Sequence, residues 1–425
     1  MNKIHFIGIG GIGMSGLARL LKYEGKEVSG SDVIETENTQ KLIEEDIPVV
    51  YEQKKENIQT EPPFDLVIYT EAIHQDNPEL QAAKDAGIPT MNYFEALGEM
   101  ANEYYVIAVA GTHGKTTTTA MLTDILEEAS FDPTAIIGAL RTKTGSNFRP
   151  GKSKYFIVEA CEYKRDFLTL EPDMLIITNI EHEHVDYYKN LSDVQDAFRE
   201  LAQKVPEEGD IIALTSDKNT APVLKGVKAK VHDYKAAIFQ NFSLTQPGLY
   251  NRMNAAAAFT AALTLGVSEN VARDALENFA GTQRRFEYKG KINGACIYDD
   301  YAHHPTEIEA TISGARELYP EKKLTVVFQS HTYSRTDELF DAFVNALIKA
   351  DSVFLLPIYA AREENKSGVS AEKLAEAIVK KGGVAKYFHT FEGVTVEFKE
   401  SVNENDVVII MGAGDVTEVS RLLMR

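Results

Sequence analysis

Residues 108–119 read Ala-Val-Ala-Gly-Thr-His-Gly-Lys-Thr-Thr-Thr-Thr, in which an apolar strand end runs into glycines, a lysine and a series of threonines. The two glycines allow backbone N–H groups to curl around phosphates, and the helix that follows points its positive end at them. Lys115 can reach the β- and γ-phosphates of a nucleoside triphosphate, and the Thr116 hydroxyl is placed to bind Mg²⁺. The strict P-loop formula has glycine where this chain has Val109, so the stretch is a P-loop variant. The alternative is a strand-to-helix turn with an incidental lysine.

The bulk composition is that of a globular enzyme. The chain has 425 residues and a formal net charge of −20, with 44% hydrophobic and 25% charged residues. A chain of this length is expected to form two or three domains, each with its own core. The acidity argues against nucleic acid as a partner, because a polyanion would be repelled. Cys161 and Cys296 are the two cysteines, which excludes a disulfide framework and a zinc ribbon.

Neither a signal peptide nor a membrane span is expected. The first residues form a predicted strand that leads directly into glycines and lacks the apolar region of a signal peptide. No apolar run approaches the roughly 18 residues needed to cross a bilayer. We therefore expect a soluble cytoplasmic protein without a membrane partner.

Short apolar strands alternate with helical stretches along the chain, which predicts an α/β fold of mainly parallel sheets covered by helices. Three domains are expected: a Rossmann-like N-terminal domain, a central P-loop ATPase-like domain with a mainly parallel sheet, and a Rossmann-like C-terminal α/β domain. Their predicted ranges are 1–98, 99–287 and 288–425. Strands are expected at residues 4–7, 65–69, 104–109, 155–159, 174–179, 324–328, 352–356 and 407–411.

A second glycine-rich loop follows the first predicted strand. Residues 8–13 read Gly-Ile-Gly-Gly-Ile-Gly, which satisfies G-x-G-x-x-G, and Asp32 follows the second strand, where an acid would meet a ribose hydroxyl. Taken alone, this pattern is typical of an NAD-linked dehydrogenase. The physical requirement is only a diphosphate on a helix N-terminus, and a UDP-sugar meets it as well as NAD does.

Two further strand ends carry groups suited to a metal ion near the phosphates. Glu159 is the last residue of a predicted apolar strand, and burial of its carboxylate costs free energy unless the group is paired or bound to a metal. We therefore expect its side chain to face Thr116 as a Mg²⁺ ligand. An exposed strand end is the alternative. His182 and His184 follow another strand, and at most one of them need be functional. Because Mg²⁺ prefers oxygen, a single imidazole would serve a second metal beside the phosphates, and a zinc site is disfavoured.

The last third of the chain carries arginines and histidines at a domain boundary and after the ends of predicted strands. Arg284 and Arg285 lie between two domains, where a guanidinium can stabilise charge on a transferred phosphoryl group, although an exposed linker pair is the alternative. His304 follows one strand and can orient or deprotonate an amine. Arg335 follows another strand and can bind a substrate carboxylate. Gly412–Asp415 is expected to be a strand-to-helix turn.

These motifs, in this order, resemble those of the Mur ligases over nearly the whole chain. The family's P-loop variant is Gly-Thr-x-Gly-Lys-Thr/Ser, present here at 111–116. The segments at 8–15, 299–305 and 331–336 resemble those of the alanine-adding branch; they read Gly-Ile-Gly-Gly-Ile-Gly-Met-Ser, Asp-Asp-Tyr-Ala-His-His-Pro and His-Thr-Tyr-Ser-Arg-Thr. The resemblance implies an ATP-dependent ligase of peptidoglycan precursor synthesis. Such an enzyme joins L-alanine to the carboxylate of UDP-N-acetylmuramate through an acyl phosphate.

The resemblance also implies site residues, which fall into four groups. The UDP-sugar would be bound by Gly11, Ser15 and Asp32. ATP would be bound by Gly111, Thr112, His113, Gly114, Lys115, Thr116, Thr117, Asn251, Asn254 and Asp300. Mg²⁺ or Mn²⁺ would be held by Thr116, Glu159 and His184. The catalytic residues would be Lys115, Arg285, His304 and Arg335. The protein is expected to be a monomer or a weak homodimer.

Three positions depart from the family pattern. Tyr250 stands where histidine often precedes the first adenine-side asparagine, Ala302 where glycine is common, and Thr332 where some alanine-adding members have arginine. A sibling enzyme that recycles murein tripeptide shares the P-loop and the 299–305 stretch, whereas 331–336 favours the alanine-adding branch. Two other classes remain as alternatives: an NAD-linked dehydrogenase and a nucleotide-gated binding protein without chemistry.

Overall fold

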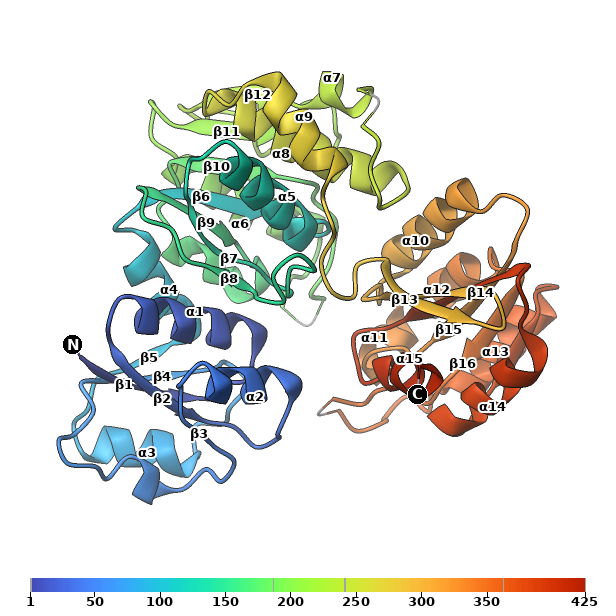
Figure 1. The fold of residues 1–425 in the computed structure, drawn as a ribbon, viewed down its shortest axis with the longest axis horizontal. Coiled ribbons are helices and arrows are strands. Elements are labelled where there is room, and N and C mark those ends of the chain that lie inside the picture. Colours follow the sequence, from blue (N-terminus) through green and yellow to red (C-terminus); the bar gives the residue numbers. More distant parts are fainter. Residues whose placement is uncertain (1, 186, 241, 362, 425) are drawn as a thin grey trace. The chain divides into compact units, whose positions relative to one another are not determined.

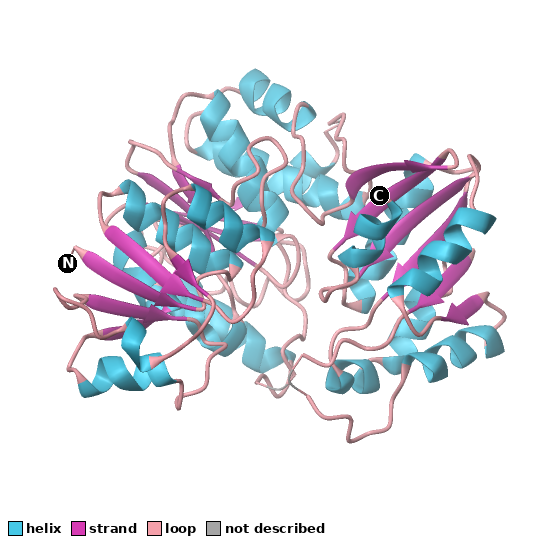
Figure 2. Ribbon diagram, turned by 60° about the horizontal axis from the view of Figure 1, so that its bottom comes forward, coloured by secondary structure: helices cyan, strands magenta, loops and turns pink. Residues whose placement is uncertain are grey.

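The computed structural model describes residues 2–185, 187–240, 242–361 and 363–424. The chain forms two compact units, of which unit 1 comprises Met1–Ser243 with Met253–Ala280, and unit 2 comprises Leu244–Arg252 with Gly281–Arg425. Unit 1 holds two sheets and unit 2 holds one, and Figure 2 shows the strands of each sheet flanked by helices. The predicted three-domain α/β class with mainly parallel sheets is confirmed. The exact domain boundaries at residues 98 and 287 stay predictions.

The N-terminal sheet, blue in Figure 1, has the strand order β3-β2-β1-β4-β5, and its neighbouring strands are parallel. Strand β1 (Lys3–Ile7) buries Ile4 to Ile7 without alternation, because helices cover both faces of a parallel sheet. The order in which strands join the sheet reverses at β1, because β2 and β3 lie on one side of it and β4 and β5 on the other. The loop that follows β1 therefore lies at the switch point where ligands bind. The other elements are α1 (Ile12–Tyr23), β2 (Glu27–Ser31), α2 (Glu37–Glu44), β3 (Val49–Val50), η1 (Lys55–Asn57), β4 (Leu66–Tyr69), α3 (Pro78–Asp85), β5 (Thr90–Asn92) and α4 (Tyr93–Ala101).

The central sheet has the order β12-β11-β10-β6-β9-β7-β8 and is parallel except for the β7–β8 hairpin at one edge. Strand β6 (Tyr105–Ala110) lies between β10 (Met174–Ile177) and β9 (Tyr155–Glu159). Because parallel strands end at the same edge, the loops after these three strands meet there. The other elements are α5 (Lys115–Glu128), β7 (Thr134–Ile136), β8 (Phe148–Arg149), η2 (Tyr163–Thr169), α6 (Leu191–Lys204), β11 (Asp210–Ala213), β12 (Lys230–Asp233), α7 (Lys235–Ile238), α8 (Leu249–Thr264) and α9 (Glu269–Glu277).

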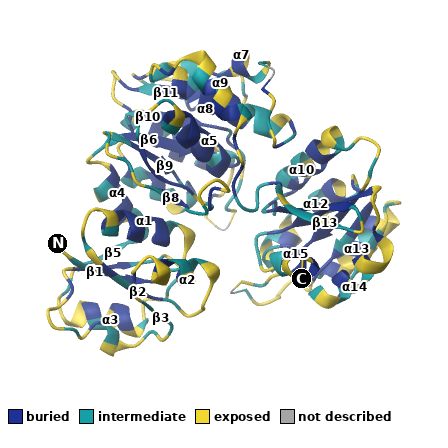
Figure 3. Cartoon of the chain, in the orientation of Figure 1, coloured by how far each residue is buried: buried dark blue, intermediate teal, exposed yellow. Residues whose placement is uncertain are grey.

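The sheet of unit 2 has the order β13-β14-β18-β15-β16-β17, with an antiparallel β13–β14 pair and parallel pairs elsewhere. Its strands are β13 (Glu287–Ile292), β14 (Ala295–Asp300), β15 (Lys323–Phe328), β16 (Ser352–Leu355), β17 (Ala385–Tyr387) and β18 (Asp406–Met411). Its helices are α10 (Pro305–Leu318), α11 (Tyr333–Glu338), α12 (Phe340–Leu347), α13 (Ala371–Lys380), α14 (Phe391–Ser401) and α15 (Thr417–Leu423). The strands β14 and β18 are buried throughout, and Figure 3 shows the buried interior of unit 2 in dark blue. Among the described residues, no helix is both long and apolar enough to cross a membrane.

Candidate active site

The P-loop joins β6 to α5 and leaves the N-terminus of that helix open to a ligand. Gly114 is the N-cap residue, with φ of 85°, and as a glycine it has no side chain of its own to cap the helix. The first turn of α5 contains no acidic residue. Such an N-terminus presents backbone N–H groups and a partial positive charge, which is the arrangement that binds phosphate.

The end of β10 fixes the shape of this loop. Asn179 accepts from the His113 N–H through Oδ1 at 2.9 Å, and its Nδ2 donates to the His113 carbonyl at 2.9 Å. The Asn179 carbonyl accepts from the Thr112 N–H at 3.0 Å, and the Thr178 hydroxyl donates to the His113 carbonyl at 2.6 Å. The loop is therefore held in its phosphate-binding shape by the neighbouring strand. Sequence reasoning assigned no role to these two residues, although they are the last two residues of a predicted strand.

Gly111 has no room for a side chain, and this gives a first prediction. Its φ is +135°, and an added Cβ would lie 2.0 Å from the Thr178 hydroxyl oxygen. We expect Gly111→Ala to displace the loop and to abolish ADP binding measured by calorimetry. Gly226→Ala is the matched control, because Gly226 also has a positive φ (+80°) but no atom lies within 4 Å of the added Cβ. The control should cost about 1 kcal/mol of stability and leave ADP binding intact. Normal ADP binding by Gly111→Ala would contradict the prediction.

Lys115 is held by a buried ion pair. Its Nζ lies 3.0 Å from a carboxylate oxygen of Glu162 and donates to the carbonyls of Gly111 (2.5 Å) and Thr112 (3.0 Å). Burial is the largest single influence and would lower the pKa of Lys115, but the charges of Glu162 and its neighbours, together with the Glu162 hydrogen bond, outweigh it and raise the pKa above its ordinary value. Burial is likewise the largest single influence on Glu162 and would raise its pKa, but the Lys115 charge and the contacts with His184 together outweigh it and hold the pKa low. Both groups are therefore charged at neutral pH.

The predicted metal ligands Thr116 and Glu159 lie together. The Thr116 hydroxyl donates to Glu159 at 3.0 Å, and the other carboxylate oxygen of Glu159 accepts from the Gly138 N–H. A hydroxyl and a carboxylate at the mouth of a phosphate loop are the oxygen ligands that Mg²⁺ prefers. The donor set thus fits a magnesium ion, and the assignment of both residues as ligands stays a prediction.

His184 belongs to a second group of potential ligands with Glu162 and Glu183. One ligand atom from each lies within 4.8 Å of the others. His184 Nε2 is 3.5 Å from Glu162, whereas His182 Nε2 contacts the Tyr188 carbonyl at 3.0 Å. Of the two histidines, His184 is thus the one beside carboxylates. Glu162 was not singled out from the sequence; its one signal is its position shortly after the β9 strand end.

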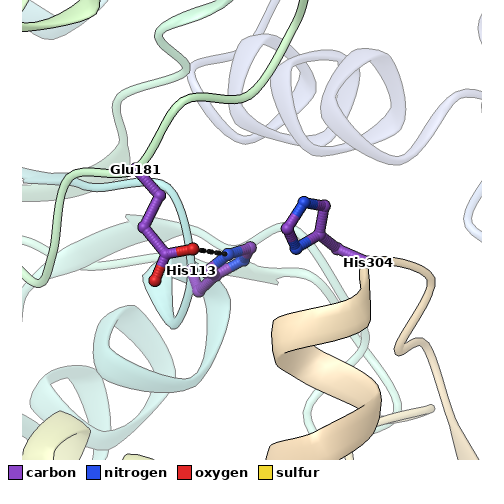
Figure 4. A group of neighbouring side chains, drawn as sticks. All are labelled: His113, Glu181 and His304. Atoms are coloured by element: carbon purple, nitrogen blue, oxygen red, sulfur yellow. Dashed lines mark ion pairs between the residues drawn. The ribbon is translucent and has the colours of Figure 1, made fainter. Parts of the chain in front are cut away.

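His113, in the middle of the P-loop, faces Glu181 from the loop after β10. The dashed line in Figure 4 marks this contact, which is 3.6 Å long and is an ion pair when the histidine is protonated. His113 is buried, with 5% of its surface exposed. The Thr112 hydroxyl accepts from the Glu181 N–H at 2.9 Å. The side chains of Thr112 and His113 thus tie the loop to the neighbouring segment of unit 1.

The second glycine-rich loop has its own supports. Asp32 accepts from the Gly10 N–H at 2.8 Å, and an added Cβ at Gly10 would lie 2.8 Å from the same carboxylate. Ser15 is fully buried in the first turns of α1, and its hydroxyl donates to the Ile12 carbonyl at 3.0 Å. Gly11 is the N-cap of α1, without a side-chain cap. The residues predicted to bind the UDP-sugar therefore surround one helix N-terminus.

One cavity joins this loop to the metal-ligand pair. It has a volume of about 310 Å³ and is lined by Gly11–Met14 of the N-terminal domain and by Gly138 and Glu159 of the central domain, among others. Both walls belong to unit 1. A group bound on the glycine-rich loop can thus extend toward the carboxylate that faces Thr116.

In unit 2, the predicted residues gather at the carboxyl ends of β14 and β15. Asp300 accepts from the backbone N–H groups of Phe286 (2.9 Å) and Ala302 (2.7 Å). The guanidinium of Arg285 lies 5.0 Å from the ring centre of Tyr301. Arg284 instead donates to the Gly412 and Gly414 carbonyls, so its role is structural.

The two histidine motifs of unit 2 also meet. The rings of His303 and His331 are 6.1 Å apart, and Arg335 lies 3.4 Å from His331 Nδ1. Burial first, and then the Arg335 charge, lower the pKa of His331 to about 4, so this ring is neutral at pH 7. His304 caps α10, where its Nδ1 accepts from the Thr306 N–H at 3.4 Å.

The two adenine-side asparagines lie in different units. Asn251 is in unit 2, where it donates to the Pro247 carbonyl at 2.9 Å. Asn254 is in unit 1 and lies against the P-loop, because a Cβ added to Gly114 would be 2.2 Å from its Oδ1. Of the three departures, Tyr250 lines a cavity with Pro305, and Thr332 precedes α11 with a φ of +67°.

Asp299 gives a prediction for the pH dependence of stability. It is 2% exposed, and burial raises its pKa to about 6. Between the unfolded value near 3.8 and pH 6 the folded state binds more protons, so stability falls as pH rises through this window. A shift of about 2 units corresponds to about 3 kcal/mol. In Asp299→Asn the thermal midpoint should therefore depend less on pH between pH 4 and 6 than it does in the wild type. The same substitution at the exposed Asp341 should leave that pH dependence unchanged. An unchanged slope in Asp299→Asn would contradict this.

Comparison with known proteins identifies the family. Models of the Mur ligase family, catalytic domain, of the Mur ligase middle domain and of the Mur ligase, glutamate ligase domain match residues 3–105, 109–235 and 284–414. The UDP-N-acetylmuramate–L-alanine ligase of Agathobacter rectalis is 43% identical over 450 residues, covering 99% of this chain and 97% of the relative. The chain belongs to the Mur ligase family. As a Mur ligase it is an ATP-dependent ligase, and the predicted resemblance is confirmed.

Solved structures agree with this membership. The UDP-N-acetylmuramate-alanine ligase of Thermotoga maritima superimposes on this Mur ligase with a TM-score of 0.82 at 28% identity, over 100% of this chain and 98% of that one. The murein peptide ligase of Psychrobacter arcticus gives a TM-score of 0.73 at 26% identity, over 99% and 98%. Since the glycine-rich loop lies in a matched Mur ligase domain, the dehydrogenase alternative has no further support.

Proposed function

We propose that this Mur ligase joins L-alanine to the carboxylate of UDP-N-acetylmuramate at the expense of ATP, in peptidoglycan precursor synthesis. The observation that carries the proposal is the cavity of about 310 Å³ shared by the glycine-rich loop and Glu159. A sugar nucleotide whose diphosphate lies on the loop can direct its lactyl carboxylate toward the P-loop. The name shared by the full-length relatives supports the same substrates. Use of ATP and a nucleotide sugar also supports the expected cytoplasmic location.

In the first step the muramate carboxylate oxygen attacks the γ-phosphorus of ATP. An O–P bond forms, the bond to the bridging oxygen breaks, and ADP leaves with its electron pair. Lys115 and the N–H groups at the start of α5 stabilise the phosphates, and we assign Arg285 to the same charge. Thr116 and Glu159 would hold one Mg²⁺ or Mn²⁺ and His184 a second, which would neutralise phosphate charge when bound.

In the second step the amine of L-alanine attacks the acyl carbon. A C–N bond forms, the C–O bond breaks with its electron pair leaving on the phosphate oxygen, and the proton lost by the amine passes to the departing phosphate. Arg335 would bind the amino-acid carboxylate. We assign His304 to orientation of the amino acid, because its Nδ1 accepts a backbone N–H and the neutral ring then carries its proton on Nε2.

The test is phosphate release from ATP that requires both UDP-N-acetylmuramate and L-alanine. Oxygen-18 placed in the lactyl carboxylate should appear in the released phosphate, because that oxygen attacks phosphorus. The second candidate, ligation of a murein tripeptide, is favoured by the likeness to the Psychrobacter arcticus enzyme. Faster turnover with the tripeptide than with L-alanine would replace the first proposal by the second. Absence of label from the phosphate would exclude the acyl phosphate.

A further inference from the structure

The glycine-rich loop of the N-terminal domain is bonded to a side chain of the central domain. Asn147 comes from the hairpin between β7 and β8 and is fully buried. Its Nδ2 donates to the Ile12 carbonyl and, at 3.3 Å, to the Ser15 hydroxyl oxygen. Both acceptors lie in the first turn of α1, which begins at Ile12 within the glycine-rich segment that is predicted to bind the diphosphate. One asparagine thus joins the two domains of unit 1 at the candidate sugar-nucleotide site.

The orientation of the Asn147 amide is fixed by Arg19. Its Oδ1 accepts from Arg19 Nη1 at 2.7 Å, and a guanidinium can only donate. The amide nitrogen must therefore point at α1. Arg19 is itself buried (6% exposed) and pairs with Glu45 through its Nε at 2.6 Å. This set of contacts leaves each atom of the Asn147 amide with a partner.

Close packing supports the same contact. Gly16, one turn further along α1, faces the hairpin, and an added Cβ would be 2.9 Å from Ile136 and 3.1 Å from Asn147 Nδ2. On the other side of the loop, Asn38 donates to the Gly10 carbonyl at 2.9 Å and to Ser15 at 2.9 Å. The loop is therefore held from its own domain by Asn38 and from the central domain by Asn147.

The hairpin continues this connection to the phosphate-transfer site. Its backbone closes through the Ile137 N–H to the Asn147 carbonyl at 2.9 Å, and the next residue, Gly138, donates its N–H to Glu159. Glu159 in turn accepts from the Thr116 hydroxyl. A continuous series of hydrogen bonds and one short peptide segment thus links the diphosphate loop to the start of α5.

We propose that Asn147 is a positioning residue that sets the distance between the sugar-nucleotide loop and the P-loop. The role in turnover rests on the proposed function, whereas the effect on the loop itself does not. In-line attack needs reacting atoms in near contact, and a displacement of about 1 Å can cost about 100-fold in rate. Asn147 would act by keeping the diphosphate loop in register with Glu159 and Thr116, without touching the reacting atoms.

The experiment compares Asn147→Asp with wild type. Aspartate keeps the size and the acceptor for Arg19 but cannot donate to Ile12 and Ser15. We expect the KM for UDP-N-acetylmuramate to rise about 10-fold and kcat to fall about 10- to 100-fold, with the Kd for ADP within twofold of wild type. Thr144→Ala, at the exposed tip of the same hairpin, is the control and should change none of these values. Equal losses of both affinities, or no loss, would overturn the proposal.

A second measurement does not depend on the reaction. Amide hydrogen exchange in the folded protein should become faster at residues 8–16 in Asn147→Asp, and stay unchanged at residues 111–119. Unchanged exchange at 8–16 would overturn the positioning role even in an active enzyme. The wild-type protein could fail to join L-alanine to UDP-N-acetylmuramate while exchange at residues 8–16 still becomes faster in Asn147→Asp. That result would refute the proposed function but would support the positioning of the loop by Asn147.

Discussion

Lys115→Ala is expected to lower kcat by about 1000-fold or more. The ammonium group is the permanent positive charge of the P-loop, and it lies 2.5 Å from the Gly111 carbonyl inside the loop. Removal of a preorganised donor to developing charge costs about 100- to 1000-fold, and here a full charge is lost as well. The measurement is phosphate release that depends on UDP-N-acetylmuramate and L-alanine. Lys54→Ala is the control, since Lys54 pairs with Glu52 at the surface, lines no part of the 310 Å³ cavity and should leave kcat unchanged.

The same substitution affects folding, and a second variant separates the two effects. Without Lys115, the carboxylate of Glu162 (2% exposed) loses its main partner, which costs about 3–5 kcal/mol. Adding Glu162→Gln removes the uncompensated charge and should restore most of the thermal midpoint. Activity should stay low in the double variant, because the phosphate contact is still missing. A single Lys115→Ala variant with normal turnover would exclude the lysine from the reaction.

Glu159→Gln is expected to reduce kcat by about 100-fold and to raise the Mg²⁺ concentration for half-maximal activity at least about 10-fold. Metal-assisted charge stabilisation contributes several kcal/mol, and an amide is a far weaker ligand than a carboxylate. Glutamine keeps an oxygen that can accept from Gly138 and a group that can contact Thr116, so the fold should survive. Activity is measured in a Mg²⁺ titration, with the thermal midpoint recorded in parallel.

Glu128→Gln is the matched control for this titration. Glu128 lies at the far end of α5, exposed to solvent, so the substitution removes the same charge from the same helix away from the P-loop. Its Mg²⁺ dependence should equal that of wild type. If Glu159→Gln also showed wild-type Mg²⁺ dependence, the metal would have to be held without this carboxylate.

Features that depend on residues close together in the chain could be predicted from the amino-acid sequence. The strand, glycine loop and helix at 105–128 form one continuous segment, so local patterning predicts it, and β6 and α5 lie there. Strands expected at 155–159, 324–328 and 407–411 correspond to β9, β15 and β18 to within about one residue. Local turn chemistry and continuous apolar runs are sufficient for this, because buried parallel strands carry apolar residues on both faces.

The side chains that support the site from distant parts of the chain became apparent in the folded structure. Glu162 lies 47 residues from Lys115, Asn179 lies 66 residues from His113, and Asn147 lies 128 residues from Arg19. No local period relates such positions, since their contacts arise from the order of strands in the sheets and from the packing of α1 on a hairpin. Their polar side chains lose water only once the chain has folded, and the need to pair buried polar groups then selects these partners.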